Sequence, residues 1–272
     1  MQDPTLAPRL DELTGNLRAL GSVLVAFSGG ADSAFVLAAA VRALGPSAVV
    51  AATAVSPSLA TAELPAAAAF ASSLGVRHVT PTTDELSRDG YVANAGDRCF
   101  HCKATLLDTL RPLAASLGLA HVATGTNADD ATAGFRPGIK AARERGAVTP
   151  LLDAGLTKAQ VRATSRLWGL STADKPALAC LASRIAYGVA VTPSGLARVD
   201  RAETAVRAHL GQVVTDLRVR DLGDGVARLE LDAAALAACD DAVLELVRAE
   251  GFGTVTVAVY RSGSLNDALV QA

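Results

Sequence analysis

Hydrophobic and polar positions follow two alternating patterns along the N-terminal part of the chain. Short runs rich in β-branched residues predict strands at 22–27, 48–55, 77–82 and 121–126. Between them, longer runs rich in Ala and Leu predict helices at about 33–44, 60–74 and 103–117. Each of these helices is followed by a glycine, as helix ends favour. This alternation predicts an α/β fold, a parallel sheet with helices on both faces.

The pattern changes in the C-terminal part of the chain. Thr157 and Gln160 form a capping-box pattern that predicts a helix ending at Gly169. After residue 188 the sequence predicts a helix near 193–210, a hairpin with its turn at 222–225, a helix near 232–250 and a strand at 254–260. We therefore expect an α/β domain at 1–188 and a small α+β domain at 189–272.

Composition and charge narrow the class of protein. A chain of 272 residues can bury a substantial core without disulfides. No apolar stretch of about eighteen residues lacks charges, so no membrane span is predicted. The charged segment 1–20 lacks the features of a signal peptide and is interpreted as a cytoplasmic helix. A net charge of -2 gives no positive field for nucleic acid, so a small anionic substrate is expected instead.

A glycine-containing loop follows the first predicted strand directly and leads into the first predicted helix. Its sequence is SGGADS, at 28–33. Glycines let the backbone approach an anion, and the amides at the helix start point toward it. An acid in this loop can hold Mg²⁺ on a phosphate. An ordinary turn followed by a helix cap is the alternative. The candidate residues are Ser28, Gly29, Gly30, Asp32 and Ser33.

Two further segments are expected at the same edge of the sheet. Ligands bind at the carboxyl ends of parallel strands. Ser56 follows the second strand, and the segment with Gly125, Asn127 and Asp130 follows the fourth. We expect these residues to face a nucleotide, although a Ser-Pro-Ser turn equally explains Ser56.

The phosphate loop resembles a known signature. SGGxDS after the first strand is similar to the PP-loop of the ATP pyrophosphatases, which include GMP synthetase, NAD synthetase and tRNA-thiolating enzymes. The resemblance implies ATP and Mg²⁺ as cofactors, formation of an adenylate and release of pyrophosphate. The segment from Gly125 to Asp130 is similar to the second nucleotide motif of these enzymes.

Three cysteines form the second group of residues that indicates a particular chemistry. Cys99 and Cys102 form a C-x-x-C at the start of a predicted helix, where Arg98 and Lys103 favour thiolates, and Cys180 lies further along. Three thiolates on a [4Fe-4S] cluster leave one iron open to carry sulfide. The alternative is a zinc ion that is bound by the three cysteines and by a fourth ligand such as His101. A redox dithiol would leave Cys180 unexplained.

The chain as a whole resembles the LarE family, the ATP-dependent sulfur-insertion enzymes of nickel-pincer nucleotide biosynthesis. The matching motifs lie at 27–33, 135–140, 146–148, 180–188, 218–220 and 260–267. The resemblance implies pyridinium-3,5-biscarboxylic acid mononucleotide as substrate and a nucleophilic or cluster-binding Cys180. One branch of the family sacrifices the sulfur of this cysteine, and another has a C-x-x-C and is thought to use a cluster. Cys99 and Cys102 place the chain with the second branch.

Basic residues in these motifs are candidate anion ligands. Arg suits planar contacts to phosphate and carboxylate, and Arg184 is the candidate nearest to Cys180 in sequence. Four more arginines are candidates for binding the substrate phosphate or the adenylate, with solvated surface charge as the alternative. They are Arg136, Arg218, Arg220 and Arg261. The family resemblance also implies a homo-oligomer.

Two other functions compete with sulfur transfer to a pyridinium nucleotide. A tRNA-thiolating enzyme would need a basic surface, and often a zinc finger built from additional cysteines, which this composition lacks. A nucleotide-binding module with a structural metal would bind ATP without releasing pyrophosphate. The source of sulfide is not indicated by any motif.

Overall fold

The computed structural model describes residues 3–132, 134, 136–176 and 179–266 and divides the chain into two compact units. The first unit contains Met1–Ser56, Ala62–Glu85 and Cys99–Leu178. The second contains Pro57–Thr61, Leu86–Arg98 and Ala179–Ala272. Phe135 and Asp267, which belong to the predicted family motifs, lie outside the described residues.

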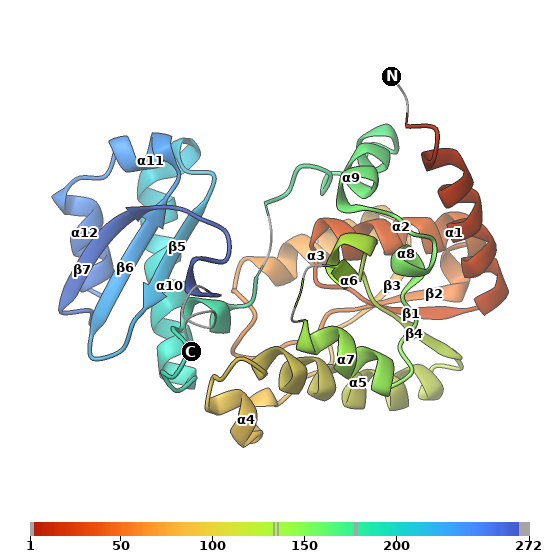
Figure 1. Cartoon of the computed structure of the whole chain (residues 1–272), viewed down its shortest axis with the longest axis horizontal. Coiled ribbons are helices and arrows are strands. Elements are labelled where there is room, and N and C mark those ends of the chain that lie inside the picture. The colour runs from red at the N-terminus through yellow and green to blue at the C-terminus, as the bar shows by residue number, and fades with distance from the viewer. Residues whose placement is uncertain (1–2, 133, 135, 177–178, 267–272) are drawn as a thin grey trace. The chain divides into compact units, whose positions relative to one another are not determined.

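A parallel sheet forms the centre of the first unit (Figure 1). Among the described residues its strand order is β3-β2-β1-β4, and every neighbouring pair is parallel. The strands are β1 (Val23–Ala26), β2 (Val49–Ala52), β3 (Arg77–Val79) and β4 (His121–Ala123). The sheet confirms the predicted α/β fold, although each strand is shorter than its apolar run.

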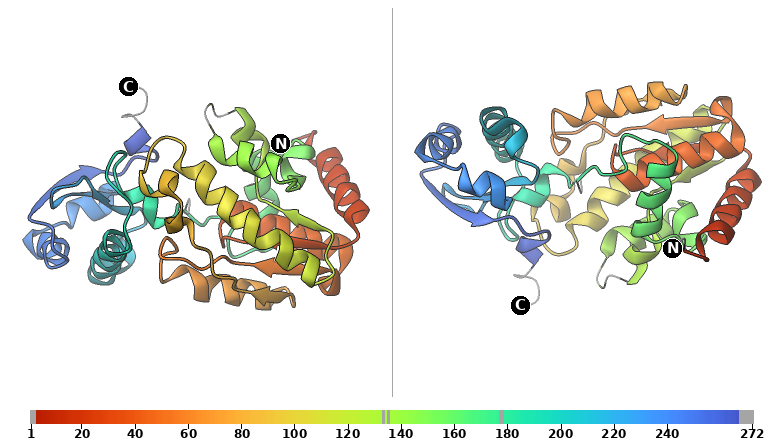
Figure 2. Two further views of the ribbon diagram at one scale, coloured as in Figure 1. Left: turned by 90° about the horizontal axis from the view of Figure 1, so that it is seen from below. Right: turned by 90° about the horizontal axis from the view of Figure 1, so that it is seen from above.

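Helices cover both faces of this sheet (Figure 2). Alternate β1 side chains point to opposite faces. Val23 and Val25 pack with α1 (Leu6–Leu20), α2 (Ala31–Leu44), α3 (Glu63–Ser73) and α9 (Lys158–Leu167). Leu24 packs instead with α5 (Arg98–Ser116) and α7 (Pro137–Glu144). The short helices α6 (Ala128–Thr132) and α8 (Pro150–Asp153) follow β4 and α7.

The predicted helix starts agree with the structure to different degrees. The capping box is confirmed, because Thr157 Oγ1 accepts a hydrogen bond from Gln160 N at 3.3 Å and Gln160 Oε1 accepts one from Thr157 N at 3.1 Å. α5 begins at Arg98 and not near residue 103. The C-x-x-C therefore lies within its first turn.

The second unit has a sheet with strand order β5-β6-β7. The hairpin of β5 (Leu217–Asp221) and β6 (Val226–Leu231) turns at 222–225, as predicted, and β7 (Thr254–Val259) is parallel to β6. The helices of this unit are α4 (Asp89–Val92), α10 (Pro193–Leu210), α11 (Ala233–Ala237) and α12 (Asp241–Arg248). The predicted single helix at 232–250 was wrong, because Asp240 caps a new helix by accepting a hydrogen bond from Val243 N at 3.1 Å.

The units differ from the predicted domains at 1–188 and 189–272. The second unit begins at Ala179 and also includes the segments 57–61 and 86–98. Hydrogen bonds within the unit explain this difference: Leu181 N donates to Ser58 O at 2.9 Å, and the Asn94 side chain donates to the carbonyls of Ala186 and Val189.

Short 3-10 turns complete the described structure at Pro46–Ala48, Glu85–Ser87, Leu181–Arg184, Gly211–Val213 and Ser264–Asn266. Within the described ranges, no helix combines the length and apolar character needed to cross a membrane.

Candidate active site

The phosphate loop connects the end of β1 to the start of α2. Gly29 has φ of 76°, a conformation that favours glycine, and Gly30 is the extended N-cap of the helix. Ser28 Oγ and Ser33 Oγ lie 3.1 Å apart, and Ser33 Oγ donates to Gly30 O at 3.1 Å. The structure therefore brings together the predicted loop residues in a turn that begins a helix, where backbone amides can receive an anion.

Gly125 lies directly against this loop. A Cβ atom added to it would be 2.8 Å from Ser33 N and 3.0 Å from the carbonyl carbon of Asp32. A side chain here would push the end of β4 away from the helix start. This close approach explains the glycine and brings the segment after β4 to the phosphate loop, as the sequence predicts.

Asp32 and Asp130 form an acidic pair at this edge of the sheet. Asn127 N donates to Asp130 Oδ2 at 3.2 Å, and Asp130 N donates to Asn127 Oδ1 at 3.1 Å, so the two side chains fix each other. Burial raises the pKa of Asp32, as does the nearby Asp130 carboxylate, while Lys158 and Asn127 lower it.

The acidic pair fits a divalent cation. Asp32 Oδ1 is buried and accepts no hydrogen bond from the part of the chain that the structure describes. Carboxylate oxygens are the ligands that Mg²⁺ prefers, together with phosphate oxygens. A cation would therefore satisfy a buried oxygen for which the described residues provide no donor.

Two further candidate residues, Ser56 for the nucleotide and Arg136 for the substrate phosphate, have partners in the first unit. Ser56 Oγ donates to Glu85 Oε1 at 2.5 Å, and the Glu85 side chain is buried. Arg136 Nη2 lies 3.9 Å from Asp130 Oδ1, beside the acidic pair. Their contacts with a nucleotide or a substrate stay predictions.

The C-x-x-C lies at the start of α5, in the same unit as the predicted nucleotide-binding residues. Cys99 is exposed and Cys102 is half-buried. Burial lowers the pKa of Lys103. The nearby Cys102, Cys99 and Asp130 raise this pKa and offset part of the effect, so the net pKa is below its usual value. The lysine therefore lies near both thiols and Asp130. Cys99 and Cys102, three residues apart on a helix, share one face, and their thiols are a suitable donor set for iron or zinc.

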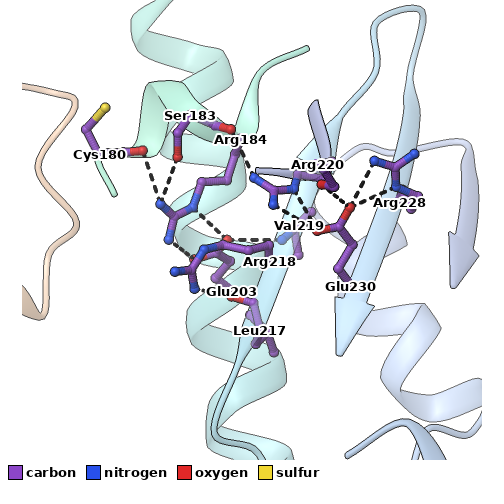
Figure 3. A network of polar contacts seen from close by, with 11 residues as sticks. Cys180, Ser183, Arg184, Glu203, Leu217, Arg218, Val219, Arg220, Arg228 and Glu230 are labelled. Carbon is purple, nitrogen blue, oxygen red and sulfur yellow. Dashed lines mark hydrogen bonds and ion pairs between the residues drawn. The ribbon is translucent and has the colours of Figure 1, made fainter. Parts of the chain in front are cut away.

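Cys180 immediately precedes the 3-10 turn at Leu181–Arg184, and its side chain is exposed. Arg184 fastens this turn (Figure 3). Its Nη1 donates to the carbonyl oxygens of Ala179 and Cys180, the latter at 3.1 Å. Its Nε and Nη2 donate to the two carboxylate oxygens of Glu203 at 2.9 and 3.0 Å.

The Arg184–Glu203 ion pair is buried inside the second unit. Burial lowers the pKa of Arg184, but the Glu203 carboxylate raises it further, so the net pKa is above the usual value. Glu203 Oε1 also accepts a hydrogen bond from Val219 N at 3.0 Å. Arg184 therefore connects the backbone at Cys180 to α10 and β5. A direct contact between Arg184 and substrate, as predicted, stays a prediction.

Arg218 and Arg220 lie on β5 beside this ion pair. Arg220 is paired with Glu230 at 2.8 Å and donates to Ser183 O at 3.0 Å. Burial and the neighbouring Arg184 lower the pKa of Arg218. Figure 3 shows four guanidinium groups, those of Arg184, Arg218, Arg220 and Arg228, with the carboxylates of Glu203 and Glu230. The spacing of Arg218 and Arg220 on β5 predicts a shared anion, and binding of an anion by these side chains stays a prediction.

The predicted cluster ligands are distributed over the two units. Cys99 and Cys102 belong to the first unit, whereas Cys180 and the candidate Arg261 belong to the second. Within the described parts of the chain, no group of three or more His, Cys, Asp or Glu side chains is placed to hold a metal ion. Each unit by itself contains only part of the predicted ligand set, so the cluster stays a prediction.

Sequence reasoning missed Glu203 as a residue of the site. The sequence feature that could have identified it is its position in α10, among the buried residues Leu196, Val199, Val206 and Leu210. An acid on the apolar face of an amphipathic helix needs a buried partner. The partner, Arg184, is 19 positions away and on another element, so the sequence does not identify it.

Loss of the Glu203 carboxylate is expected to destabilise the second unit. Glu203→Leu should lower the free energy of unfolding by about 3–5 kcal/mol, because it leaves a buried guanidinium unpaired. Urea denaturation measures the change. Glu250→Leu is the matched control, because its partner Arg201 is largely exposed and such pairs contribute less than about 1 kcal/mol. An equal loss in the two variants would contradict the assignment.

Comparison with known proteins identifies the family. The sequence matches no protein-family model. It is 41% identical, over 98% of the chain and 100% of the relative, to an uncharacterised protein of Synechocystis sp.. It is also 36% identical, over 98% of the chain and 97% of the relative, to the pyridinium-3,5-bisthiocarboxylic acid mononucleotide synthase of Lactiplantibacillus plantarum. End-to-end similarity at this level shows that the chain belongs to the LarE family.

Proposed function

We propose that this protein adenylates a carboxylate of pyridinium-3,5-biscarboxylic acid mononucleotide with ATP and converts it to a thiocarboxylate. The family relationship supports sulfur transfer to such a substrate, because the characterised relative is named for a bisthiocarboxylic acid product. The observation that carries the ATP-dependent step is the acidic pair Asp32 and Asp130 at the phosphate loop, where a buried Asp32 oxygen lacks a hydrogen-bond donor among the described residues.

In the adenylation step, the chain's own groups bind and orient ATP. Amides of the loop 28–33 bind its phosphates, while Gly29 permits the turn and Gly125 lets the segment after β4 approach the loop. Asp32 and Asp130 would hold Mg²⁺, which neutralises phosphate charge when bound. A substrate carboxylate oxygen attacks the α-phosphorus, and the bond to the bridging oxygen of the pyrophosphate breaks.

In the sulfur step, sulfur attacks the carbonyl carbon of the acyl adenylate, and AMP leaves with the electron pair of the broken C–O bond. Cys99, Cys102 and Cys180 would hold a [4Fe-4S] cluster, which supplies an iron site for sulfide when bound. Arg184 holds the backbone carbonyl of Cys180 and so fixes the backbone that carries its thiol. In the alternative mechanism, the Cys180 thiolate attacks the acyl adenylate and AMP leaves. Loss of the Cα proton then breaks the Cβ–S bond, which leaves dehydroalanine at position 180 and the sulfur on the substrate.

The second unit offers a binding site for the anionic part of the substrate. We propose that the guanidinium groups of Arg184, Arg218 and Arg220, which lie close together, bind the phosphate of a pyridinium mononucleotide. We further propose a cytoplasmic homo-oligomer that takes sulfide from an external donor and binds neither nucleic acid nor membrane.

Asp32→Ala is expected to abolish pyrophosphate release without unfolding the protein. Removing a carboxylate that holds Mg²⁺ at the transferring phosphate should cost several kcal/mol of transition-state stabilisation, a rate loss of about a hundredfold or more. Release is measured with the dicarboxylate substrate and ATP. Asp174→Ala, at an exposed carboxylate paired with Arg166, is the control and should match wild type. Near wild-type release by folded Asp32→Ala would refute the ATP-dependent step.

A further inference from the structure

Arg98 is the first residue of α5 and directly precedes Cys99, and it has no role in the function proposed above. Its side chain is buried, with 5% of the residue exposed. Its Nη1 donates to Asn94 Oδ1 at 2.5 Å and to the Ala182 carbonyl oxygen at 2.8 Å. Ala182 is 84 positions away in sequence and belongs to the 3-10 turn that follows Cys180. One buried guanidinium therefore joins the residue before Cys99 to the turn after Cys180.

Asn94 holds the same segment at further points. It is fully buried, and its φ of 53° lies in the left-handed region that residues other than glycine rarely adopt. Its side-chain nitrogen donates to the carbonyls of Ala186 and Val189 at 2.8 and 2.9 Å, while its side-chain oxygen accepts from Arg98. Such backbone strain persists only where the surrounding contacts fix it, and it is frequent at functional sites. Asn94 and Arg98 together therefore fix the backbone of residues 182–189.

Two arginines thus hold the Cys180 turn, and they do so in different ways. Arg184 belongs to the turn itself and donates to the carbonyls of Ala179 and Cys180. Arg98 comes from the segment that leads into α5, and it belongs to the same compact unit as the turn. The contact of Arg184 fixes the shape of the turn. The contact of Arg98 fixes the position of the turn relative to the chain that enters α5.

A contact of the second kind lowers the cost of bringing two distant thiols to one ligand. When both thiols bind, the chain between them closes into a loop, and the entropic cost of closure grows with the length of that loop. A hydrogen bond from a charged donor is roughly twice as strong as a neutral one. Such a contact, next to Cys99 and two positions after Cys180, therefore raises the effective concentration of one thiol at the other.

We propose that Arg98 is a positioning residue of the sulfur step, which keeps the Cys180 thiol within reach of Cys99 so that both can bind one cluster. This inference rests on the proposed cluster mechanism. Arg98 acts through the carbonyl of Ala182 and transfers neither a proton nor an electron. Arg98→Met should therefore slow formation of the thiocarboxylate about tenfold or more. It should leave pyrophosphate release unchanged, because the phosphate loop belongs to the first unit.

The effective concentration of Cys99 at Cys180, measured in metal-free protein, tests this inference without the cluster. The parent variant is full-length Cys102→Ser, which cannot form a disulfide within the C-x-x-C. It is equilibrated with reduced and oxidised glutathione, and peptide mass spectrometry gives the fraction that contains a Cys99–Cys180 disulfide. Adding Arg98→Met should lower the effective concentration about tenfold or more. Arg98→Lys retains a charged donor and should recover part of it.

The control is Arg201→Met in the same parent. Arg201 is a largely exposed cation of α10 that pairs with Glu250, so its loss should leave the effective concentration unchanged. Circular dichroism checks that the variants are folded, and Arg98→Gln replaces the methionine variant if that one is not. A general loss of stability lowers the unfolding temperature of a variant. It does not change the effective concentration of two thiols in the protein that remains folded.

The outcomes separate this inference from the function on which it rests. An effective concentration equal to that of the parent in the Arg98→Met and Arg98→Gln variants would overturn it, as would a parent that forms no Cys99–Cys180 disulfide. Iron content and thiolation by the wild-type protein test the proposed function separately. A wild-type protein that holds no iron when prepared anaerobically would refute the proposed cluster, and this inference with it.

Discussion

Cys180→Ala is expected to abolish formation of the thiocarboxylate while pyrophosphate release continues. Cys180 is either the nucleophile or a cluster ligand, so both mechanisms lose the sulfur step without it. The phosphate loop and its acidic pair belong to the first unit and do not include this cysteine. Two measurements on one reaction test the expectation: pyrophosphate by a coupled assay and thiolated nucleotide by mass spectrometry.

The control for this variant is Cys239→Ala. Cys239 is half-buried, and burial raises the pKa of its thiol, with Asp240 adding to the effect. A thiol kept protonated is a poor nucleophile and a poor ligand. This variant should therefore thiolate as wild type does. If Cys180→Ala produced thiolated substrate at the wild-type rate, Cys180 would have no part in the mechanism.

Replacing either Cys99 or Cys102 with serine is expected to remove most of the iron and the multiple-turnover activity together. Three thiolates are needed to leave one iron of a cluster open, and two of them come from the first turn of α5. Protein prepared under anaerobic conditions is compared for iron, acid-labile sulfide and visible absorption. Each variant is then assayed for more than one thiolation per chain with added sulfide.

Mass spectrometry of the protein after turnover distinguishes the two branches of the family. An enzyme that uses a cluster keeps Cys180 intact, whereas a sacrificial enzyme loses hydrogen sulfide from this residue, once per chain. An iron-free native protein that converts Cys180 to dehydroalanine and tolerates Cys99→Ser would contradict the cluster proposal. The C-x-x-C would then be a zinc or packing site.

Features that depend on neighbouring residues could be predicted from the sequence. The capping box at Thr157, the hairpin turn at 222–225 and the parallel sheet all follow from local patterns, and all are confirmed. The start of α5 was predicted too late, because Arg98 is held by the Asn94 side chain and the Ala182 carbonyl. Asn94 lies outside the helix and Ala182 is distant in sequence. The local hydrophobic periodicity therefore does not reveal either contact.

The same distinction applies to the candidate site. The loop residues Ser28 to Ser33 and the segment beginning at Gly125 could be predicted because each is a contiguous motif next to a strand. The roles of Arg98 and Glu203 could not, since they depend on Ala182 and Arg184, which other elements bring to them. The spacing of Arg218 and Arg220 indicated an anion site. It did not indicate that Glu230 already pairs with Arg220.

The most direct test of the central claim is the mass of the nucleotide product. Pyridinium-3,5-biscarboxylic acid mononucleotide is incubated anaerobically with the protein, ATP, Mg²⁺ and sulfide, and the product is analysed together with AMP and pyrophosphate. We expect a nucleotide in which sulfur replaces one carboxylate oxygen, with one AMP and one pyrophosphate formed for each sulfur introduced. An unchanged nucleotide, or a thiolated one formed without AMP, would contradict an adenylating sulfur transferase.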